Sequence, residues 1–132
     1  MAVISSRVQQ FARRFVKFGL VGGSGVVVNT AALFALTEWA RVGLSIASPI
    51  AVEFAIINNF YWNNVWTFRA RGIDAGRLVK FNLVSLVGMA ITTGVLLFLV
   101  GNFGIHYLIA NLFGIGVAMV WNFLVNFFWT WG

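Results

Sequence analysis

The sequence predicts an all-α membrane protein in which four transmembrane helices form a tandem parallel repeat of two two-helix units. Three observations lead to this fold class. Of the 132 residues, 61% are hydrophobic and only 9% are charged, whereas about a quarter of a soluble domain is charged. Four apolar runs are each long enough to cross the hydrocarbon of a bilayer. One offset of 63 residues aligns 12–67 with 75–130 without a gap and gives 19 identical positions.

The apolar runs define the expected spans in chain order, at residues 18–37, 46–66, 81–100 and 107–130. Each is expected to be a helix, because lipid offers no partners for backbone amides and the runs are too long and too few for a barrel. The basic stretch before the first run fits either a short amphipathic helix on the membrane surface or a frayed tail.

The positions of the basic residues predict the orientation. Arg41 alone lies in the first or third connection, whereas the other cations lie at the N-terminus or in the middle loop: Arg7, Arg13, Arg14, Lys17, Arg69, Arg71, Arg77 and Lys80. Because cytoplasmic loops carry an excess of Lys and Arg, we expect both termini and the middle loop to be cytoplasmic in a multi-pass protein of the inner cell membrane. The cations flank apolar runs and form no long basic face, so no nucleic-acid partner is expected.

The internal repeat is most specific at its polar positions. The matched pairs are Arg14 with Arg77, Lys17 with Lys80, Thr30 with Thr93, Asn59 with Asn122, Asn63 with Asn126, and Trp66 with Trp129. Each repeat, about 11–69 and 74–132, holds two spans, so both insert the same way up within one domain of 132 residues. This predicts a parallel repeat related by an axis along the membrane normal, with its amides and cations gathered at the cytoplasmic side.

The repeated amides lie on one helical face with an indole. Asn59, Asn63 and Trp66 are spaced i, i+4, i+7, and the second repeat has the same spacing in Asn122, Asn126 and Trp129. A carboxamide within lipid needs partners, so these faces are expected to point into the bundle or a wet cavity. Two interpretations stay open: the amides join neighbouring helices, or they line a polar groove that binds a headgroup.

Two further polar residues lie within the spans. Glu53 is the one carboxylate inside a span, and it is either a functional group or a protonated side chain that a neighbouring helix satisfies. Asn29 lies midway along the first span and either joins the groove or bonds a backbone group. The chain has no cysteine, no Ser/His/Asp set and no carboxylate pair at catalytic spacing, so we expect no enzyme activity, no metal and no cofactor.

Two stretches of the sequence resemble a known family, the GtrA-like family of small four-span membrane proteins. They are Phe15-Val16-Lys17-Phe18-Gly19-Leu20-Val21-Gly22-Gly23 followed by Asn29, and Asn59-Phe60 through Asn63 followed by Val65-Trp66-Thr67-Phe68-Arg69. The resemblance extends from Phe11 to Trp131. The second repeat departs from the first because no basic residues follow its motif in Trp131-Gly132.

The resemblance implies a role in cell-surface polysaccharide synthesis or glycosylation, with a polyprenyl-phosphate-linked sugar as the translocated lipid and a glycosyltransferase as a neighbour. Cations best placed for its phosphate are Arg14, Lys17, Arg69, Arg77 and Lys80. Side chains suited to its sugar are Asn59, Asn63, Asn122, Asn126, Trp66, Trp129, Glu53 and Asn29. Four spans are few for a closed route, so a groove open to lipid or a homodimer is expected.

Three functions compete. The leading hypothesis is a flippase for the lipid-linked sugar. The second is a membrane anchor or scaffold that docks a glycosyltransferase without transport, because similar modules occur fused to polyprenyl-phosphate sugar synthases. The third is a small proton-coupled cation exporter, for which Glu53 is the one intramembrane carboxylate.

Overall fold

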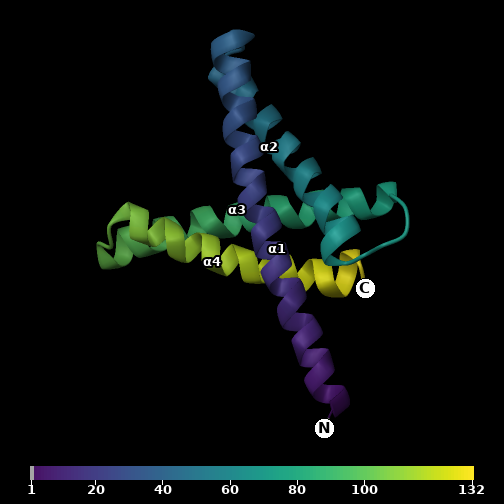
Figure 1. Cartoon of the computed structure of the whole chain (residues 1–132). Coiled ribbons are helices and arrows are strands. Elements are labelled where there is room, and N and C mark those ends of the chain that lie inside the picture. The colour runs from purple at the N-terminus through teal and green to yellow at the C-terminus, as the bar shows by residue number, and fades with distance from the viewer. Residues whose placement is uncertain (1) are drawn as a thin grey trace. The chain divides into compact units, whose positions relative to one another are not determined.

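A computed structural model describes residues 2–132, and these form helices and turns without a strand. The long helices are α1 (Ala2–Phe34), α2 (Leu44–Trp62), α3 (Ala75–Phe103) and α4 (Tyr107–Val125), labelled in Figure 1. Three short π-helical segments continue them, namely η1 (Ala35–Trp39) after α1, η2 (Asn63–Thr67) after α2 and η3 (Asn126–Thr130) after α4. The predicted all-α class is confirmed.

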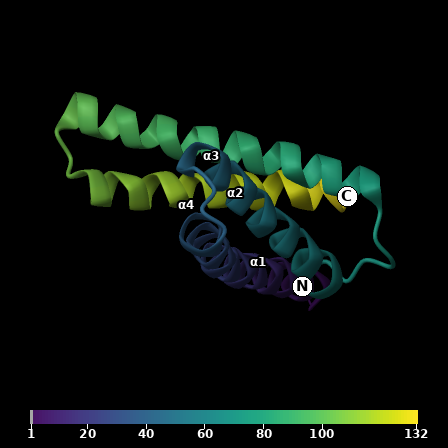
Figure 2. The ribbon, with the colours of Figure 1, turned by 90° about the horizontal axis from the view of Figure 1, so that it is seen from above.

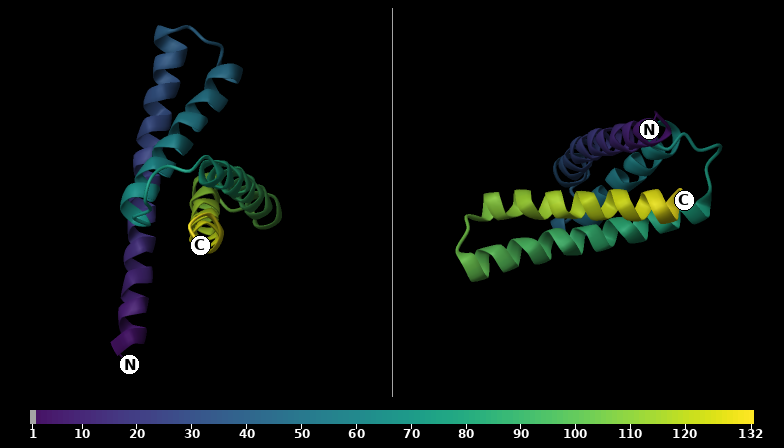
Figure 3. Two further views of the ribbon diagram at one scale, coloured as in Figure 1. Left: turned by 90° about the vertical axis from the view of Figure 1, so that its right-hand side faces the viewer. Right: turned by 90° about the horizontal axis from the view of Figure 1, so that it is seen from below.

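The chain divides between Ile73 and Asp74 into two compact units. In the first unit α1 packs against α2 and η2, and in the second α3 packs against α4 and η3. Figure 2 shows α3 and α4 lying side by side in opposite directions. Figure 3 shows that the N-terminal end of α1 extends past the end of α2. Each unit is therefore a helical hairpin, and the two are described separately below.

Each of the four predicted spans corresponds to a helix that is long and apolar enough to cross a membrane: Ala2–Trp39, Leu44–Thr67, Ala75–Phe103 and Tyr107–Thr130. Three of the helices begin before their apolar runs, by the widest margins at α1 and α3. Residues 2–34 form one continuous helix, so no separate surface helix precedes the first span among the described residues. Helix α3 begins at Ala75 because the Asp74 side chain accepts a hydrogen bond from Gly76 N–H at 2.7 Å and caps it.

The two hairpins share many features at an offset of 63 residues. Helices α2 and α4 begin and end 63 residues apart, and each continues into a π-helical segment. The turns correspond as well, because Arg41 and Gly104 both have positive φ, at 55° and 63°. Their cores match in Phe18 with Phe81, Val21 with Val84, and Phe60 with Phe123, and all six are buried.

Candidate functional site

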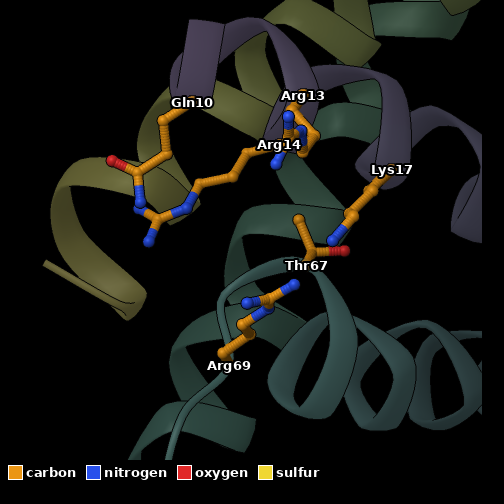
Figure 4. A pocket seen from close by; sticks show the side chains of 6 residues that line it. All are labelled: Gln10, Arg13, Arg14, Lys17, Thr67 and Arg69. Atoms are coloured by element: carbon orange, nitrogen blue, oxygen red, sulfur yellow. The ribbon is translucent and has the colours of Figure 1, made fainter. Parts of the chain in front are cut away.

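A small pocket lies at the end of the first hairpin where α1 meets η2. Its lining residues are Gln10, Arg13, Arg14, Lys17, Thr67 and Arg69, and its volume is about 80 Å³. Four of the six are cations, and none is a carboxylate or a histidine. In Figure 4 the charged ends of Lys17 and Arg69 both point toward Thr67. The pocket therefore concentrates positive charge within reach of one small ligand.

Helix α1 supplies four of the lining residues from one face. Gln10, Arg13, Arg14 and Lys17 are spaced i, i+3, i+4, i+7, which places them one above another along a helix. The guanidinium of Arg14 also lies over the ring of Phe68, 5.8 Å from its centroid. The continuity of α1 from Ala2 onward thus fixes where the first three cations stand.

The chain after η2 brings the fourth cation, Arg69, to the pocket. η2 ends with Phe68 N–H donating to the Asn63 carbonyl at 2.8 Å. Arg69 then takes a left-handed conformation with φ of 48°. The buried side chain of Asn64 donates to the Gly72 carbonyl at 2.8 Å, and Ala70 N–H donates to the Asn64 carbonyl at 2.8 Å. This tight turn holds the loop back against the helix end, so Arg69 faces α1.

The repeated asparagine of each π-helical segment pairs with the threonine one turn later. Thr67 Oγ1 donates to Asn63 Oδ1 at 2.7 Å, and Thr130 Oγ1 donates to Asn126 Oδ1 at 2.6 Å. Both asparagines are buried, at 1% and 0% exposure. The pairs satisfy carboxamide oxygens that would otherwise be unpaired within the protein. Because Thr67 gives its hydroxyl proton to Asn63, it can offer the pocket only acceptor lone pairs.

An indole lies under the lysine of each hairpin. Lys17 Nζ is 5.1 Å from the Trp66 ring centroid, and Lys80 Nζ is 5.2 Å from that of Trp129. Ammonium groups at this distance are attracted to the negative face of the ring. The ring faces predicted to stack on a sugar therefore meet a lysine in this structure. For Lys17 the contact also holds the ammonium beside the pocket.

The other repeated asparagine of each hairpin packs onto a glycine of the facing helix. A Cβ at Gly25 would overlap the Asn59 carboxamide, and one at Gly88 would overlap that of Asn122. In the first hairpin Asn58 Nδ2 donates to Asn59 Oδ1 at 3.3 Å. Asn122 Oδ1 has no hydrogen-bond partner, and it is the one such buried side-chain atom within residues 2–132. Both amides therefore pack against the facing helix of their own hairpin.

The structure places the sequence-predicted residues in different settings. Arg14, Lys17 and Arg69 meet at the pocket, whereas Glu53 and Asn29 are half-buried along α2 and α1 and do not line it. Arg77 and Lys80 belong to the second hairpin, where Arg77 Nε lies 3.9 Å from Asp74 Oδ2. The headgroup role assigned to the amides, the indoles and Glu53 stays a prediction.

Three lining residues were not among the predicted site residues: Gln10, Arg13 and Thr67. The helical spacing of Gln10 and Arg13 from Arg14 and Lys17 places all four side chains on one face. The sequence could therefore have predicted Gln10 and Arg13 as lining residues if the first helix had been extended toward the N-terminus through the basic residues. Thr67 belongs to the repeated motif, but its position at the pocket depends on the π-helical turn.

Comparisons with known proteins place the chain in context. The family model described as "GtrA/DPMS, transmembrane domain" matches residues 17–131. A protein of Pyrococcus furiosus named dolichol-phosphate mannosyltransferase is 43% identical over 127 residues, which cover 89% of this chain and 34% of the relative. The chain thus spans about a third of the length of that relative.

A second relative is the Bacillus subtilis protein named uncharacterized membrane protein YngA. It is 29% identical over 117 residues, which cover 88% of this chain and 78% of that protein. The chain is therefore similar both to part of a longer protein and to most of a short one.

Proposed function

The chain belongs to the GtrA/DPMS transmembrane-domain family, and on that premise we propose that it binds a polyprenyl-phosphate-linked sugar and moves it across the cytoplasmic membrane. It is a multi-pass membrane protein with four membrane-spanning helices. The proposed lipid would serve cell-surface polysaccharide synthesis or glycosylation. We propose that the chain itself catalyses no reaction.

The observation that carries the proposal is the pocket with four cations at the end of the first hairpin. A phosphate group is anionic and accepts several hydrogen bonds, and guanidinium groups bind it through paired donors. Arg13, Arg14, Arg69 and Lys17 offer such donors at the end of a span, where a lipid phosphate lies while its tail stays in hydrocarbon. A lipid-linked phosphate thus fits the pocket in both charge and location.

The proposal places the repeat in the membrane as the sequence predicts. Both hairpins would insert the same way up, with both termini and the middle loop cytoplasmic and the pocket at the cytoplasmic surface. The shared contacts at an offset of 63 residues, such as Gly25 with Asn59 and Gly88 with Asn122, support two units of one design.

A reconstituted transport assay tests the proposal. The purified chain is placed in liposomes, and a polyprenyl-phosphate sugar is followed from one leaflet to the other. We expect faster movement than in protein-free vesicles. Arg69→Asn should slow it by about tenfold, because one charge-assisted hydrogen bond is lost. Asn also tolerates positive φ, so the backbone is kept.

Arg41→Asn is the matched control, since Arg41 has the same left-handed conformation in the connection at the other end of the hairpin. Its rate should stay at the value of the unsubstituted chain. A wild-type rate no greater than that of empty vesicles would contradict the proposal.

A second candidate function is a membrane anchor or scaffold for a glycosyltransferase. It is favoured by the match to about a third of a protein named as a mannosyltransferase. In cells, Asn63→Leu combined with Asn126→Leu should abolish polysaccharide output if the chain transports lipid. Intact output in a correctly folded double variant, together with loss of output when the loop charges are reversed, would favour the scaffold instead.

A further inference from the structure

We propose that the pocket of the first hairpin prefers a phosphate monoester to a phosphate diester, and so binds the sugar-free polyprenyl phosphate more tightly than the sugar-linked lipid that the chain moves. This inference rests on the proposed function, because it takes a polyprenyl lipid as the ligand. It goes further by assigning which chemical form of the lipid the cations recognise.

The charge of the lining carries the first step. A phosphate monoester bears a charge of about −1.5 to −2 at neutral pH, because its second pKa is about 6. A sugar-bearing diester has one ionisable oxygen and keeps a single negative charge. Four cations line the pocket and no carboxylate offsets them there. A ligand with the larger negative charge therefore gains more from this lining.

The donors in the pocket carry the second step. Thr67 gives its proton to Asn63 at 2.7 Å, so the donors toward a ligand are the cations and the amide of Gln10. A monoester presents three terminal oxygens to these donors. A diester presents two, because its third is bonded to the sugar. The donor set thus matches the monoester better.

The size of the pocket carries the third step. Its volume is about 80 Å³, whereas pockets that enclose a drug-sized ligand have about 300–1,000 Å³. One phosphate group is small enough for this space. A hexose attached to the phosphate would extend through the open side of the pocket and gain little from the cationic lining.

The second hairpin shows that this cation set is not a by-product of the repeat. At an offset of 63 residues, Gln10, Arg13 and Arg69 correspond to Ile73, Gly76 and Gly132. Arg77 and Lys80 remain, but Arg77 lies beside Asp74. The four-cation lining is therefore a property of the first hairpin, which accords with one phosphate per chain.

The preference places the chain in a reaction sequence. The reaction class is glycosyl transfer to or from a lipid phosphate, because attachment of a sugar converts the monoester to a diester and its removal restores the monoester. A pocket that prefers the monoester would bind the polyprenyl phosphate before a sugar is attached to it, or after the sugar has been removed.

Equilibrium binding to the full chain in detergent micelles tests the inference. The probe is radiolabelled polyprenyl phosphate, and the competitors are polyprenyl-phosphate glucose and inorganic phosphate. At pH about 7.5 the monoester lipid should bind about tenfold more tightly than the glucosyl lipid, as one further charge-assisted hydrogen bond implies. Inorganic phosphate should compete far more weakly, because it lacks the tail.

The pH dependence provides a second readout. The charged groups that face the ligand are Arg13, Arg14 and Lys17 from α1 and Arg69 after η2, and no carboxylate or histidine lines the pocket with them. The monoester loses one charge on going from pH about 7.5 to about 5, so its affinity should fall toward that of the diester. The affinity of the diester should stay constant.

Variants show whether the pocket is responsible. Arg13→Gln should reduce the preference for the monoester, whereas Arg7→Gln, on the same helix but outside the pocket, should leave it unchanged. Circular dichroism verifies that both variants are helical.

Each result decides between the proposals. Equal binding of both lipids, or equal competition by inorganic phosphate, would overturn the inference while leaving lipid binding in place. Failure of every polyprenyl lipid to bind would overturn the proposed function itself.

Discussion

The close approach of α3 and α4 at Gly114 yields a sharp prediction for the second hairpin. Gly114 is buried, and a Cβ added there would lie 2.7 Å from the carbonyl oxygen of Thr92. That oxygen belongs to the backbone, so no rotamer change removes the overlap. Gly114→Ala should therefore force the two helices apart. Gly116→Ala is the matched control, because nothing lies within 4 Å of a Cβ there.

The magnitude follows from the geometry. Ordinary van der Waals contact begins at 3.4 Å, so the backbones must separate by about 0.7 Å. Overpacking of this kind costs about 1–3 kcal/mol. Both substitutions also gain about 0.5–1 kcal/mol from the better helix propensity of Ala. This gain is the same for both variants, so it drops out when their free energies of unfolding are compared. We therefore expect Gly114→Ala to be about 1–3 kcal/mol less stable than Gly116→Ala.

The assay is an SDS titration of each purified variant in mixed micelles, followed by tryptophan fluorescence. The unfolding midpoint of Gly114→Ala should fall clearly below that of Gly116→Ala. The Thr92 hydroxyl, which lies 3.5 Å from the Gly114 carbonyl, should move away with its helix. Equal midpoints for the two variants would refute the packing described for α3 and α4.

Three further predictions concern the π-helical ends and the pocket. Thr67→Val should lower the free energy of unfolding by about 1–3 kcal/mol, because it leaves the buried Asn63 oxygen unpaired. The control Thr30→Val, at an exposed site, should change the free energy of unfolding by less than about 0.5 kcal/mol. Equal losses for the two variants in an SDS titration would contradict this prediction. A double-mutant cycle of Lys80→Met and Trp129→Leu should give a coupling energy of about 0.5–1 kcal/mol, and no coupling would exclude the cation–π contact. Binding of polyprenyl phosphate to detergent-solubilised protein should weaken as salt rises from about 0.1 M to 1 M, because the screening length falls from about 10 Å to 3 Å, and a constant affinity would argue against a site made of charges.

Much of the fold could be predicted from the sequence, because membrane spans leave a strong signal. Each apolar run lies within one of the helices, since the bilayer demands both apolar side chains and a paired backbone. The helix ends could not be predicted as well. The start of α3 depends on the cap by Asp74, which carries no hydropathy signal.

The candidate site could be predicted in part. The sequence predicts that Arg14 and Lys17 bind a phosphate, because they lie near the start of the first repeat and directly before a membrane span. The structure brings both to the pocket with Arg69. The position of Arg69 depends on the turn that Asn64 closes onto Gly72, and Asn64 has no counterpart in the repeat. Such a turn leaves no periodic pattern, so the way in which the pocket is closed emerges only from the structure.

Nuclear magnetic resonance of the arginine side chains tests the central claim most directly. The chain is labelled with ¹⁵N at the arginine Nε positions, held in micelles and titrated with polyprenyl phosphate. The account predicts shifts of the Nε–Hε signals of Arg13, Arg14 and Arg69, with the signals of Arg7 and Arg41 unchanged. Shifts of equal size at all seven arginines of the chain, or none at the three that line the pocket, would contradict it.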